Sequence, residues 1–233
     1  MALMKATVCL PTYNERENVE RMVRSLHALD VQVLVIDDNS PDGTGELADG
    51  LARELEGVAV LHRPHKDGLG PAYIAGFHRA LADGAELILE MDCDFSHDPA
   101  DVPRLIAASD TADVTLGSRY VAGGGVENWA LRRRIQSRGG CAYARLILGV
   151  PVRDLTGGFK CWRRGALEAV DLNGVDAHGY GFQIEMTYRA IKASLSVTEV
   201  PIVFRERREG QSKMSAWITL EAVWKVPALR LRG

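Results

Sequence analysis

Two aspartates separated by one residue, Asp92 and Asp94, have the clearest potential for chemistry in this sequence. They follow residues 87–91, a short apolar segment that is predicted to be a strand. Two carboxylates on such a tight bend can share a divalent cation, Mg²⁺ or Mn²⁺, which in turn bridges a diphosphate. Ser96 offers a further oxygen ligand, whereas His97 is assigned no catalytic role. An Asp-x-Asp pair is common by chance, so this interpretation needs support from other residues.

A second acidic segment follows residues 31–36, which are also predicted to form a strand. Asp37 and Asp38 leave this strand end together, and Asp38 could accept hydrogen bonds from a base or a ribose. Asp42, in the turn Pro41-Asp42-Gly43, is interpreted as a cap of the following helix. Two carboxylates at one strand end exceed what capping requires, so a polar ligand is expected here.

The first predicted strand, residues 6–10, leads into the segment Pro11-Thr12-Tyr13-Asn14-Glu15. Tyr13 could lie beneath a nucleobase, with Glu15 at the start of the next helix. Asn14 is at the same time a candidate N-cap residue of that helix, and the two roles are compatible.

Basic side chains gather in the second half of the chain. Residues 1–129 hold ten basic and 22 acidic side chains, whereas residues 130–164 hold nine basic and one acidic, a net charge of +8. Such a segment suggests an anionic partner: nucleic acid, a phosphorylated substrate or a membrane surface. It could equally be a solvated helix face. The side chains that could meet phosphate oxygens are Arg119, Arg132, Arg133, Arg134, Ser137, Arg138, Arg207 and Lys213, and at helical spacing Arg133 and Ser137 share one face.

Short β-branched segments alternate with helix-like segments through the first half. The expected strands are residues 6–10, 31–36, 58–61, 87–91 and 114–116, and the expected helices are residues 15–29, 45–55, 72–82 and 99–107. This alternation indicates βαβ units around a buried parallel sheet, whose ligands bind at the carboxyl ends of the strands. Beyond it we expect a loop at residues 123–125, a basic helix over 129–148, a short segment at 159–162, a helix over 183–192 and a strand over 197–204.

Length and composition restrict the class of protein. The 233 residues fit one domain. Four dispersed cysteines argue against a zinc site or a disulfide framework and favour a reducing compartment. The sequence shows no signal peptide, and no apolar stretch approaches the ~20 residues that a membrane-spanning helix needs.

Several segments taken together resemble the polyprenol-phosphate (dolichol-phosphate) mannose synthases, which are inverting nucleotide-sugar glycosyltransferases of GT-A fold. They are PTYNERENV, VIDDNSPDGT, MDCDFSHDP, GSRY, DLTGGFK, GYGFQIEM and EGQSK, and they span the chain from about Lys5 to about Ser215. The resemblance implies a single α/β domain with a Rossmann-like, mostly parallel sheet flanked by helices. It also implies a nucleotide-sugar-binding half (1–120), an acceptor-binding half (121–214) and a C-terminal amphipathic helix (215–233).

The resemblance implies roles for individual residues. Asp92, Asp94 and Arg119 would be catalytic, with Asp92, Asp94 and Ser96 holding the metal. Arg133 and Ser137 match the positions that bind the acceptor phosphate. The expected contacts of the nucleotide sugar are Pro11, Tyr13, Glu15, Ile36, Asp38, Asp92, Cys93, Asp94, Arg119, Arg207 and Lys213.

The sequence departs from the family pattern at three places. Many relatives have alanine where this chain has Cys93, and several prokaryotic relatives have glutamine, a third metal ligand, where Ser96 stands. The first change keeps the backbone contact, whereas the second puts the tightness of metal binding in question. Gly139-Gly140-Cys141 also replaces the more usual residues after the serine.

The implied reaction is transfer of mannose from GDP-mannose to a polyprenyl (dolichyl) monophosphate with inversion at the sugar carbon. The acceptor phosphate has a second pKa of about 6, so it is already anionic at pH 7 and needs no general base. The lipid tail of the acceptor calls for a membrane surface. Residues 217–231 carry Trp217, Leu220, Trp224 and Ala228 near one helical face, so this helix lies at the membrane interface or packs on the domain. We expect peripheral attachment at the cytoplasmic face, directly or through a separate anchor protein.

Three other functions are considered. The same fold could use UDP-glucose to make polyprenyl-phosphate glucose. The basic segment could belong to a nucleic-acid-binding module, although the acidic first half and the few aromatic residues among the arginines weigh against nucleic acid. A catalytically inactive scaffold is disfavoured because every charged position expected at the site is filled.

Overall fold

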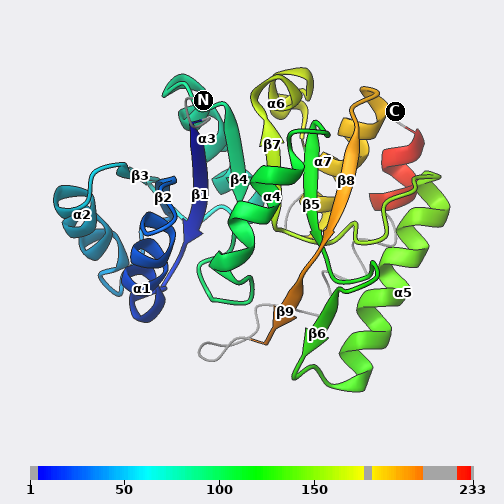
Figure 1. The fold of residues 1–233 in the computed structure, drawn as a ribbon, viewed down its shortest axis with the longest axis horizontal. Coiled ribbons are helices and arrows are strands. Elements are labelled where there is room, and N and C mark those ends of the chain that lie inside the picture. Colours follow the sequence, from blue (N-terminus) through cyan, green and yellow to red (C-terminus); the bar gives the residue numbers. More distant parts are fainter. Residues whose placement is uncertain (1–4, 176–179, 207–224, 232–233) are drawn as a thin grey trace.

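The computed structural model describes residues 5–175, 180–206 and 225–231. In these residues a seven-stranded sheet has the order β3-β2-β1-β4-β7-β5-β8, and a two-stranded sheet pairs β6 with β9 (Figure 1). The strands are β1 (Ala6–Thr12), β2 (Gln32–Asp37), β3 (Val58–His62), β4 (Leu87–Glu90), β5 (Val114–Ser118), β6 (Gly125–Glu127), β7 (Lys160–Arg163), β8 (Val197–Pro201) and β9 (Val203–Arg205). The helices are α1 (Arg16–His27), α2 (Thr44–Glu54), α3 (Leu69–Ala82), α4 (Val102–Ala108), α5 (Leu131–Leu148), α6 (Arg164–Ala169) and α7 (Tyr180–Lys192), with short 3-10 turns at Pro99–Asp101 and Leu172–Gly174.

The large sheet is parallel except at β7, which runs antiparallel to both β4 and β5. The five strands and four helices expected in the first half are confirmed, with end points that differ by a few residues. The predicted fold class, an α/β domain with a mostly parallel sheet flanked by helices, is therefore confirmed. The antiparallel insertion of β7 between β4 and β5 is not evident from hydrophobic pattern alone, since a four-residue segment has the same pattern in either direction.

The strand expected over residues 197–204 is instead two strands in different sheets. The ladder between β8 and β5 ends at Pro201, which has no N–H to donate. Ile202 then bonds to both sheets, donating to the carbonyl of Ser118 and accepting from the N–H of Gly125. The glycine segment expected to be a loop accordingly ends in β6, which pairs with β9.

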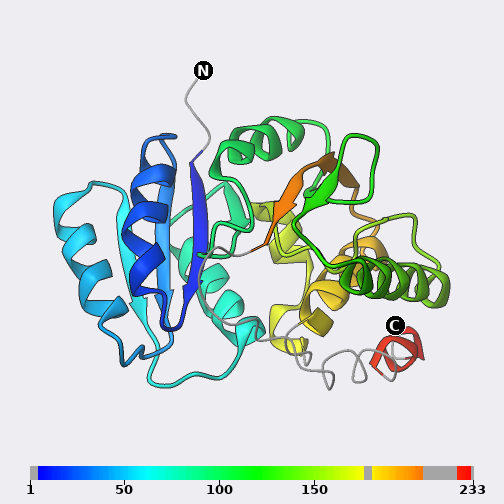
Figure 2. The same ribbon diagram turned by 90° about the horizontal axis from the view of Figure 1, so that it is seen from below.

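Two apolar layers pack on opposite faces of the sheet. Helices α1, α2 and α4 cover one face, where α1 buries Val19, Met22, Val23 and Leu26 at helical spacing. Helices α3, α6 and α7 cover the other face around Tyr73, Phe77 and Trp162. Figure 2, seen from below Figure 1, shows helices on both sides of the sheet.

Helix α5 lies beside the domain and differs along its length. Its C-terminal half is packed through Cys141, Ala144 and Leu148. Its N-terminal half extends away from the core (Figure 1). Of residues 131–140, Arg133 and Ser137 are half-buried and the others are exposed.

Candidate active site

Three neighbouring strands end at one edge of the sheet, and each leads into one of the predicted polar segments. Thr12 of β1 lies opposite Asp37 of β2, and Cys9 of β1 lies opposite Glu90 of β4. Because these strands are parallel, the segments around Tyr13, Asp38 and Asp92 leave the sheet side by side. The juxtaposition predicted from strand order is therefore confirmed.

Each of these three segments reverses direction through a residue in the left-handed region of backbone conformation. They are Asn14, Asn39 and Phe95, with φ values of 57°, 55° and 58°. Asparagine tolerates this conformation, whereas a bulky phenylalanine seldom adopts it. The strained residue stands directly after the acidic pair, and the Arg21 guanidinium lies 4.2 Å from the centre of its ring. Such strain is typical of a functional turn.

The acidic pair lies in a buried turn. Cys93, between the aspartates, is buried, and burial raises the pKa of its thiol well above the usual value, with the charges of Glu15, Asp94 and Asp92 acting in the same direction. Three carboxylates thus act on the thiol of Cys93 through their charge. The buried hydroxyl of Tyr73 donates a hydrogen bond of 3.4 Å to Asp92 Oδ1, and the N–H of Ser96 donates one of 2.9 Å to Asp94 Oδ1.

The third oxygen ligand suggested by the sequence is next to this pair. Ser96 is 1% exposed, and its Oγ makes no hydrogen bond within the described residues. A buried hydroxyl without a partner is costly, so this position fits a group that is to be bound. In the described ranges no cluster of three Asp, Glu, His or Cys side chains forms a cation site. Two carboxylates and a hydroxyl nevertheless match the oxygen preference of Mg²⁺ and Mn²⁺, with further ligands left to substrate and water.

His97 lies in an aromatic cluster behind this turn. It is 3% exposed, and its ring centre lies 5.1 Å from that of Phe159 and 5.2 Å from that of Phe204. His97 is therefore part of the aromatic packing behind the acidic turn.

We expect that Cys93→Ala retains metal-dependent activity close to that of the parent chain. The raised pKa keeps the thiol protonated, and a protonated thiol is a poor nucleophile and metal ligand. The measurement is turnover of the variant, together with mass-spectrometric detection of iodoacetamide labelling in the native protein. Rapid native labelling of Cys93, or loss of turnover on replacement, contradicts this expectation.

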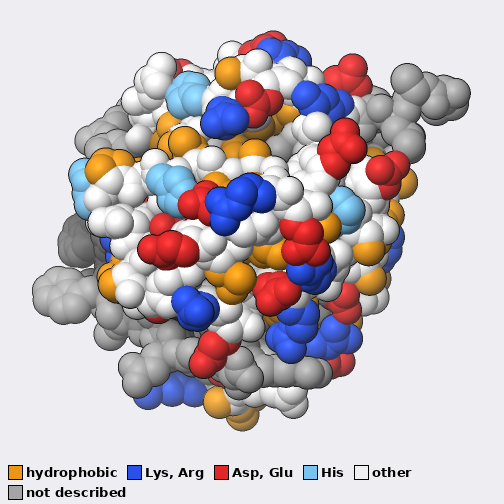
Figure 3. All heavy atoms as spheres, turned by 90° about the vertical axis from the view of Figure 1, so that its left-hand side faces the viewer, with side chains coloured by type: hydrophobic (Ala, Val, Ile, Leu, Met, Phe, Trp, Pro, Cys, Tyr) orange, Lys and Arg blue, Asp and Glu red, His pale blue; other side chains and the backbone are white. Residues whose placement is uncertain are grey.

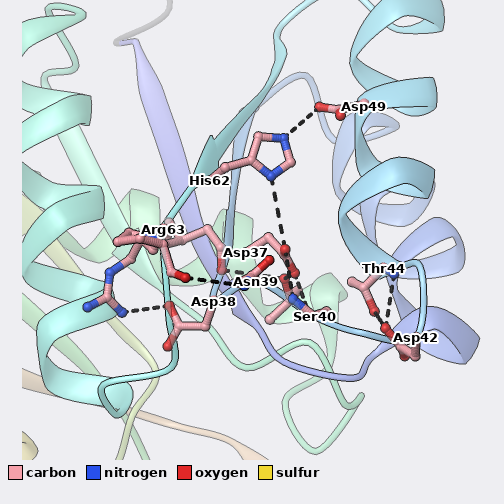
Figure 4. A network of polar contacts seen from close by, with 12 residues as sticks. Asp37, Asp38, Asn39, Ser40, Asp42, Thr44, Asp49, His62 and Arg63 are labelled. Atoms are coloured by element: carbon pink, nitrogen blue, oxygen red, sulfur yellow. Dashed lines mark hydrogen bonds and ion pairs between the residues drawn. The ribbon is translucent and has the colours of Figure 1, made fainter.

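The two carboxylates of the turn after β2 have different partners (Figure 4). Asp37 is a structural residue, since it accepts hydrogen bonds from Ser40 Oγ at 2.6 Å and from the Ser40 N–H at 3.1 Å. Asp38 is 5% exposed and forms an ion pair of 2.6 Å with Arg63, which directly follows β3. The candidate ribose-binding carboxylate thus has a basic partner that sequence analysis missed.

Asp42 stabilises the start of two helices. Its carboxylate accepts hydrogen bonds from the N–H and hydroxyl of Thr44, at 3.0 and 2.6 Å, and from the N–H of Arg16 at 3.2 Å. The N-cap residue of α2 is nevertheless Gly43; Asp42 lies one residue earlier and bonds the first N–H of each helix through its carboxylate. Asn14 as the N-cap of α1 is wrong: Glu15 is the N-cap residue, and the N–H of Asn14 instead donates to Ser40 Oγ. The left-handed backbone of Asn14 directs it away from the helix.

We expect Asp42→Ala to lower the free energy of unfolding by about 1 kcal/mol, as for loss of a helix cap. Burial raises the pKa of Asp42, but the hydrogen bonds from Thr44 and Arg16 outweigh it and lower the pKa overall. The stabilisation is therefore present above the usual carboxyl pKa and is lost as pH falls through the lowered folded-state value. Urea unfolding at neutral and acidic pH measures both effects. An Asp42→Ala variant as stable as Asp42→Ser and the parent at neutral pH contradicts this role.

The predicted nucleobase platform also has a basic partner. The Nζ of Lys66 lies 4.0 Å from the centre of the Tyr13 ring. With Arg63 it brings two basic side chains to this end of the sheet, one beside Tyr13 and one beside Asp38. Ile36 differs from the other residues expected to contact the nucleotide sugar. Its side chain is fully buried against α3, where Gly76 leaves room for it. Only its backbone is at the turn, through its carbonyl and Thr12 Oγ1.

Arg119 is buried and uses two of its three guanidinium nitrogens inside the protein. Its guanidinium donates to both carboxylate oxygens of Asp154, at 2.7 and 2.5 Å, and to Thr156 Oγ1 at 2.8 Å. Both charged groups are buried. Burial acts to lower the pKa of Arg119, but the charge of Asp154 outweighs it and raises the pKa further above its usual value. The ion pair uses Nε and Nη2, so contact with a sugar-phosphate would fall to Nη1.

The proposed acceptor residues form a separate group on the inner face of α5. Tyr120 donates a hydrogen bond of 2.6 Å to Ser137 Oγ. Arg133 lies with its guanidinium carbon 4.1 Å from the centre of the Trp129 ring and its Nη1 2.8 Å from Glu206. Its buried Nε makes no hydrogen bond within the described residues, which leaves one donor for an anion. The prediction that Arg133 and Ser137 share one face is confirmed.

A buried charged network lies beneath the site and was not identified from the sequence. Lys160 and Glu90 are both fully buried, with Nζ 3.8 Å from Oε2, while Trp162 Nε1 donates to Glu90 at 2.7 Å and Lys160 donates to Gln183. Burial raises the pKa of Glu90 and lowers that of Lys160, against the mutual attraction of the pair. Lys160 also faces the charges of Asp154 and Asp92. The charges of Asp154 and Asp92 thus favour the protonated form of this lysine, against its burial.

Part of the predicted site lies outside the described residues. Arg207 and Lys213 are there, as are Trp217, Leu220 and Trp224 of the expected amphipathic helix. Residues 225–231 are helical and pack on the domain through Val226, with Arg230 donating to the carbonyl of Ile147 at 2.6 Å. For this part of the helix the packed alternative is the one observed. In the described ranges, no helix is both long and apolar enough to span a bilayer.

Comparison with known proteins gives the same class as the fold and the acidic pair. The family model described as glycosyl transferase family 2 matches residues 7–171. The chain is 48% identical to the polyprenol monophosphomannose synthase of Mycolicibacterium smegmatis, over 98% of this chain and 88% of that protein. It is 46% identical to the undecaprenyl-phosphate mannosyltransferase of Micrococcus luteus, over 96% of this chain and 93% of that protein. The chain therefore belongs to glycosyl transferase family 2, and within it to the polyprenol-phosphate mannose synthases, as the motifs predict.

Solved structures confirm the fold at greater distance. The crystal structure of glucosyl-3-phosphoglycerate synthase from Mycobacterium tuberculosis with phosphoglyceric acid gives a TM-score of 0.71 at 19% identity, covering 98% of this chain and 80% of that chain. Another structure of that enzyme, at 18% identity and the same TM-score, holds Mn²⁺, UDP-glucose and phosphoglyceric acid. At such identities the likeness supports the GT-A fold alone.

Proposed function

We propose that this chain transfers mannose from GDP-mannose to a polyprenyl monophosphate with inversion, giving polyprenyl-phosphate β-mannose. The observation that carries the proposal is the 48% identity to a polyprenol monophosphomannose synthase over nearly the whole chain, since that name specifies both sugar and acceptor. The donor would bind in the half formed by residues 1–120 and the acceptor in residues 121–214. GDP as the nucleotide rests on the family resemblance.

The donor would lie across the strand ends. Tyr13 would stack on the base, Asp38 would accept from the ribose, and Pro11, Glu15, Ile36 and Cys93 would line the same segment through side chain or backbone. Asp92, Asp94 and Ser96 would hold a divalent cation, Mg²⁺ or Mn²⁺, whose charge stabilises the departing diphosphate. Arg119, and Arg207 and Lys213 from outside the described residues, would meet the sugar-phosphate.

The acceptor would approach from α5. Its phosphate carries the nucleophilic oxygen already ionised, so Arg133 and Ser137 need only position it for in-line attack. Arg133 would contribute the Nε donor that lacks a partner in the described residues, and Ser137 is oriented by Tyr120. No residue is nominated as a general base.

The arrangement of the basic residues weighs against the nucleic-acid alternative. Several arginines of the net-positive segment make internal contacts: Arg133 pairs with Glu206 and Arg164 with Glu168, and Arg134 donates to the carbonyl of Val126. The face at the β3 edge of the sheet mixes acidic and basic side chains (Figure 3). That face, which belongs to the net-negative first half, therefore offers no continuous basic stripe for a phosphate backbone.

The test is a donor comparison with undecaprenyl phosphate in detergent, measuring released GDP from GDP-mannose and released UDP from UDP-glucose, each with Mn²⁺ or with chelator. Release of GDP that depends on both acceptor and metal is expected. UDP release in place of GDP release identifies the polyprenyl-phosphate glucose alternative. Oligonucleotide retention without either release supports the nucleic-acid alternative.

A further inference from the structure

Trp129 lies in the short connection between β6 and α5, and the contacts around it hold the side chain in place. Asn128, directly before it, has a φ of 60°, in the left-handed region that asparagine tolerates. Arg134 Nη2 donates to the carbonyl of Val126 at 2.8 Å, which ties the helix to the strand on either side of this connection. Val126 pairs with Phe204 of β9, and the Phe204 ring packs edge-on to the Trp129 ring with centres 5.3 Å apart. The position of the indole is therefore set by both small strands and by α5.

The indole of Trp129 contacts two arginines. The guanidinium carbon of Arg133 lies 4.1 Å from its ring centre, and that of Arg119 lies 5.6 Å from it. Both distances are within the range of a cation–π interaction, which offsets part of the repulsion between two like charges held near each other. These are the arginines expected at the acceptor phosphate and at the sugar-phosphate. The ring therefore connects the acceptor side of the site with the donor side.

The indole N–H of Trp129 has no hydrogen-bond partner in the part of the chain that the structure describes. Trp129 is 9% exposed, and its Nε1 is buried. A buried indole N–H usually donates to a partner, and leaving it without one costs free energy. A phenylalanine would fill an aromatic position without this cost. The N–H at residue 129 therefore indicates a bound group that accepts a hydrogen bond.

The side chain stacked on this ring has a second buried donor of the same kind. It is Nε of Arg133, which also makes no hydrogen bond within the described ranges and is bonded directly to the guanidinium carbon over the indole. The two N–H groups thus belong to side chains in direct contact, and neither can accept a hydrogen bond. Two neighbouring donors, one of them on a cation, suit an anion with several oxygens, such as a phosphate.

We propose that Trp129 binds the phosphate of the acceptor, donating its indole N–H beside Nε of Arg133. The inference rests on the proposed function, in which Arg133 and Ser137 hold that phosphate, and it adds a third donor on a rigid ring. Glu206 pairs with Nη1 of Arg133 at 2.8 Å, and both side chains are partly exposed. Such a pair contributes little stability, so an incoming phosphate can displace Glu206 at small cost.

The first test follows the indole N–H resonances of the full chain, labelled with ¹⁵N, by nuclear magnetic resonance. The chain has four tryptophans, and the resonance lost in Trp129→Phe belongs to residue 129. Trp129→Tyr gives the same assignment where the phenylalanine variant does not fold. The probe is geranyl phosphate, a short and soluble prenyl monophosphate, and geraniol is the matched ligand without phosphate.

Geranyl phosphate should move the Trp129 resonance downfield, because the N–H gains a charged hydrogen-bond acceptor, and geraniol should leave it in place. Calorimetry with the same ligand measures binding independently. A Trp129 resonance that stays in place while geranyl phosphate binds overturns the proposal. An equal shift with geraniol, or a parent chain that does not bind geranyl phosphate, also overturns it.

The second test uses kinetics to separate hydrogen bonding from packing. Trp129→Phe keeps an aromatic ring and removes the N–H, so it should raise KM for the prenyl phosphate about tenfold to a hundredfold, the range for a hydrogen bond to a charged group. KM for GDP-mannose should stay unchanged. The matched control is Phe204→Leu, which loosens the same aromatic cluster, removes no polar group and should have a much smaller effect on the acceptor KM. Thermal unfolding checks that both variants are folded, and an equal rise of the acceptor KM in both contradicts the proposal.

The two tests separate this inference from the proposed function. If geranyl phosphate moves the Trp129 resonance but the parent chain transfers mannose to no prenyl phosphate, the proposed function fails and the phosphate site stands. If the parent chain transfers mannose while the Trp129 resonance and the acceptor KM of Trp129→Phe are unchanged, the proposed function stands and this inference fails.

Discussion

Replacing Asp92 with asparagine is expected to lower transfer about a thousandfold at saturating Mn²⁺, since it removes one of two carboxylates from the metal that stabilises the leaving diphosphate. The amide oxygen can still accept the hydrogen bond from Tyr73, so the buried tyrosine keeps its partner. The loss is therefore expected in turnover and in metal affinity, with little change in the free energy of unfolding. Steady-state rates over a Mn²⁺ titration, together with urea unfolding, measure the three quantities.

Two variants serve as comparisons for this result. Asp110→Asn removes an exposed carboxylate just beyond α4 and should leave turnover unchanged. Ser96→Ala removes the buried hydroxyl beside Asp94 and should raise the Mn²⁺ concentration needed for half-maximal rate, with a smaller loss at saturation than Asp92→Asn. If Asp92→Asn turns over like Asp110→Asn at saturating metal, the acidic pair does not have the assigned role.

Arg119→Met is expected to lower the free energy of unfolding by about 3–5 kcal/mol, because it leaves the fully buried carboxylate of Asp154 without its counter-charge. The matched control is Arg133→Met, whose ion pair with Glu206 is partly exposed and should contribute about 0–1 kcal/mol. Urea unfolding of the two variants measures the difference.

A double variant separates the structural role of Arg119 from its proposed role with the substrate. Arg119→Met combined with Asp154→Leu removes both buried charges and should recover most of the lost stability. If Nη1 of Arg119 also contacts the sugar-phosphate, the recovered protein should remain inactive. A stable and active double variant limits Arg119 to structure, and an Arg119→Met variant as stable as the parent contradicts the buried ion pair.

The sequence predicted the first half of the fold more completely than the second. In the βαβ units, strands such as 31–36 and helices such as 15–29 are long enough to show their periodicity, and parallel connection follows from their alternation. The second half depends on contacts between distant segments. The change of partner at Ile202 and the antiparallel insertion of β7 are determined by tertiary pairing, which short segments do not encode locally.

The site shows the same division between strand ends and distant partners. Asp38, Asp92 and Ser96 are at strand ends, where sequence order alone places them at the ligand-binding edge. Arg63, Asp154 and Lys160 act through partners 25, 35 and 70 residues away in sequence, so single-sequence reasoning could not pair them. One signal was available: Lys160 stands within the short apolar segment at 159–162, which makes it a candidate for a buried ion pair.

The most direct test of the central claim is transfer of labelled mannose from GDP-mannose into the lipid fraction by the purified chain, with undecaprenyl phosphate as acceptor. The parent protein should produce a labelled lipid that is abolished by chelator, restored by Mn²⁺ and nearly absent with Asp92→Asn. A purified, folded chain that leaves the lipid unlabelled under these conditions, or that labels it equally with Asp92→Asn, contradicts the account.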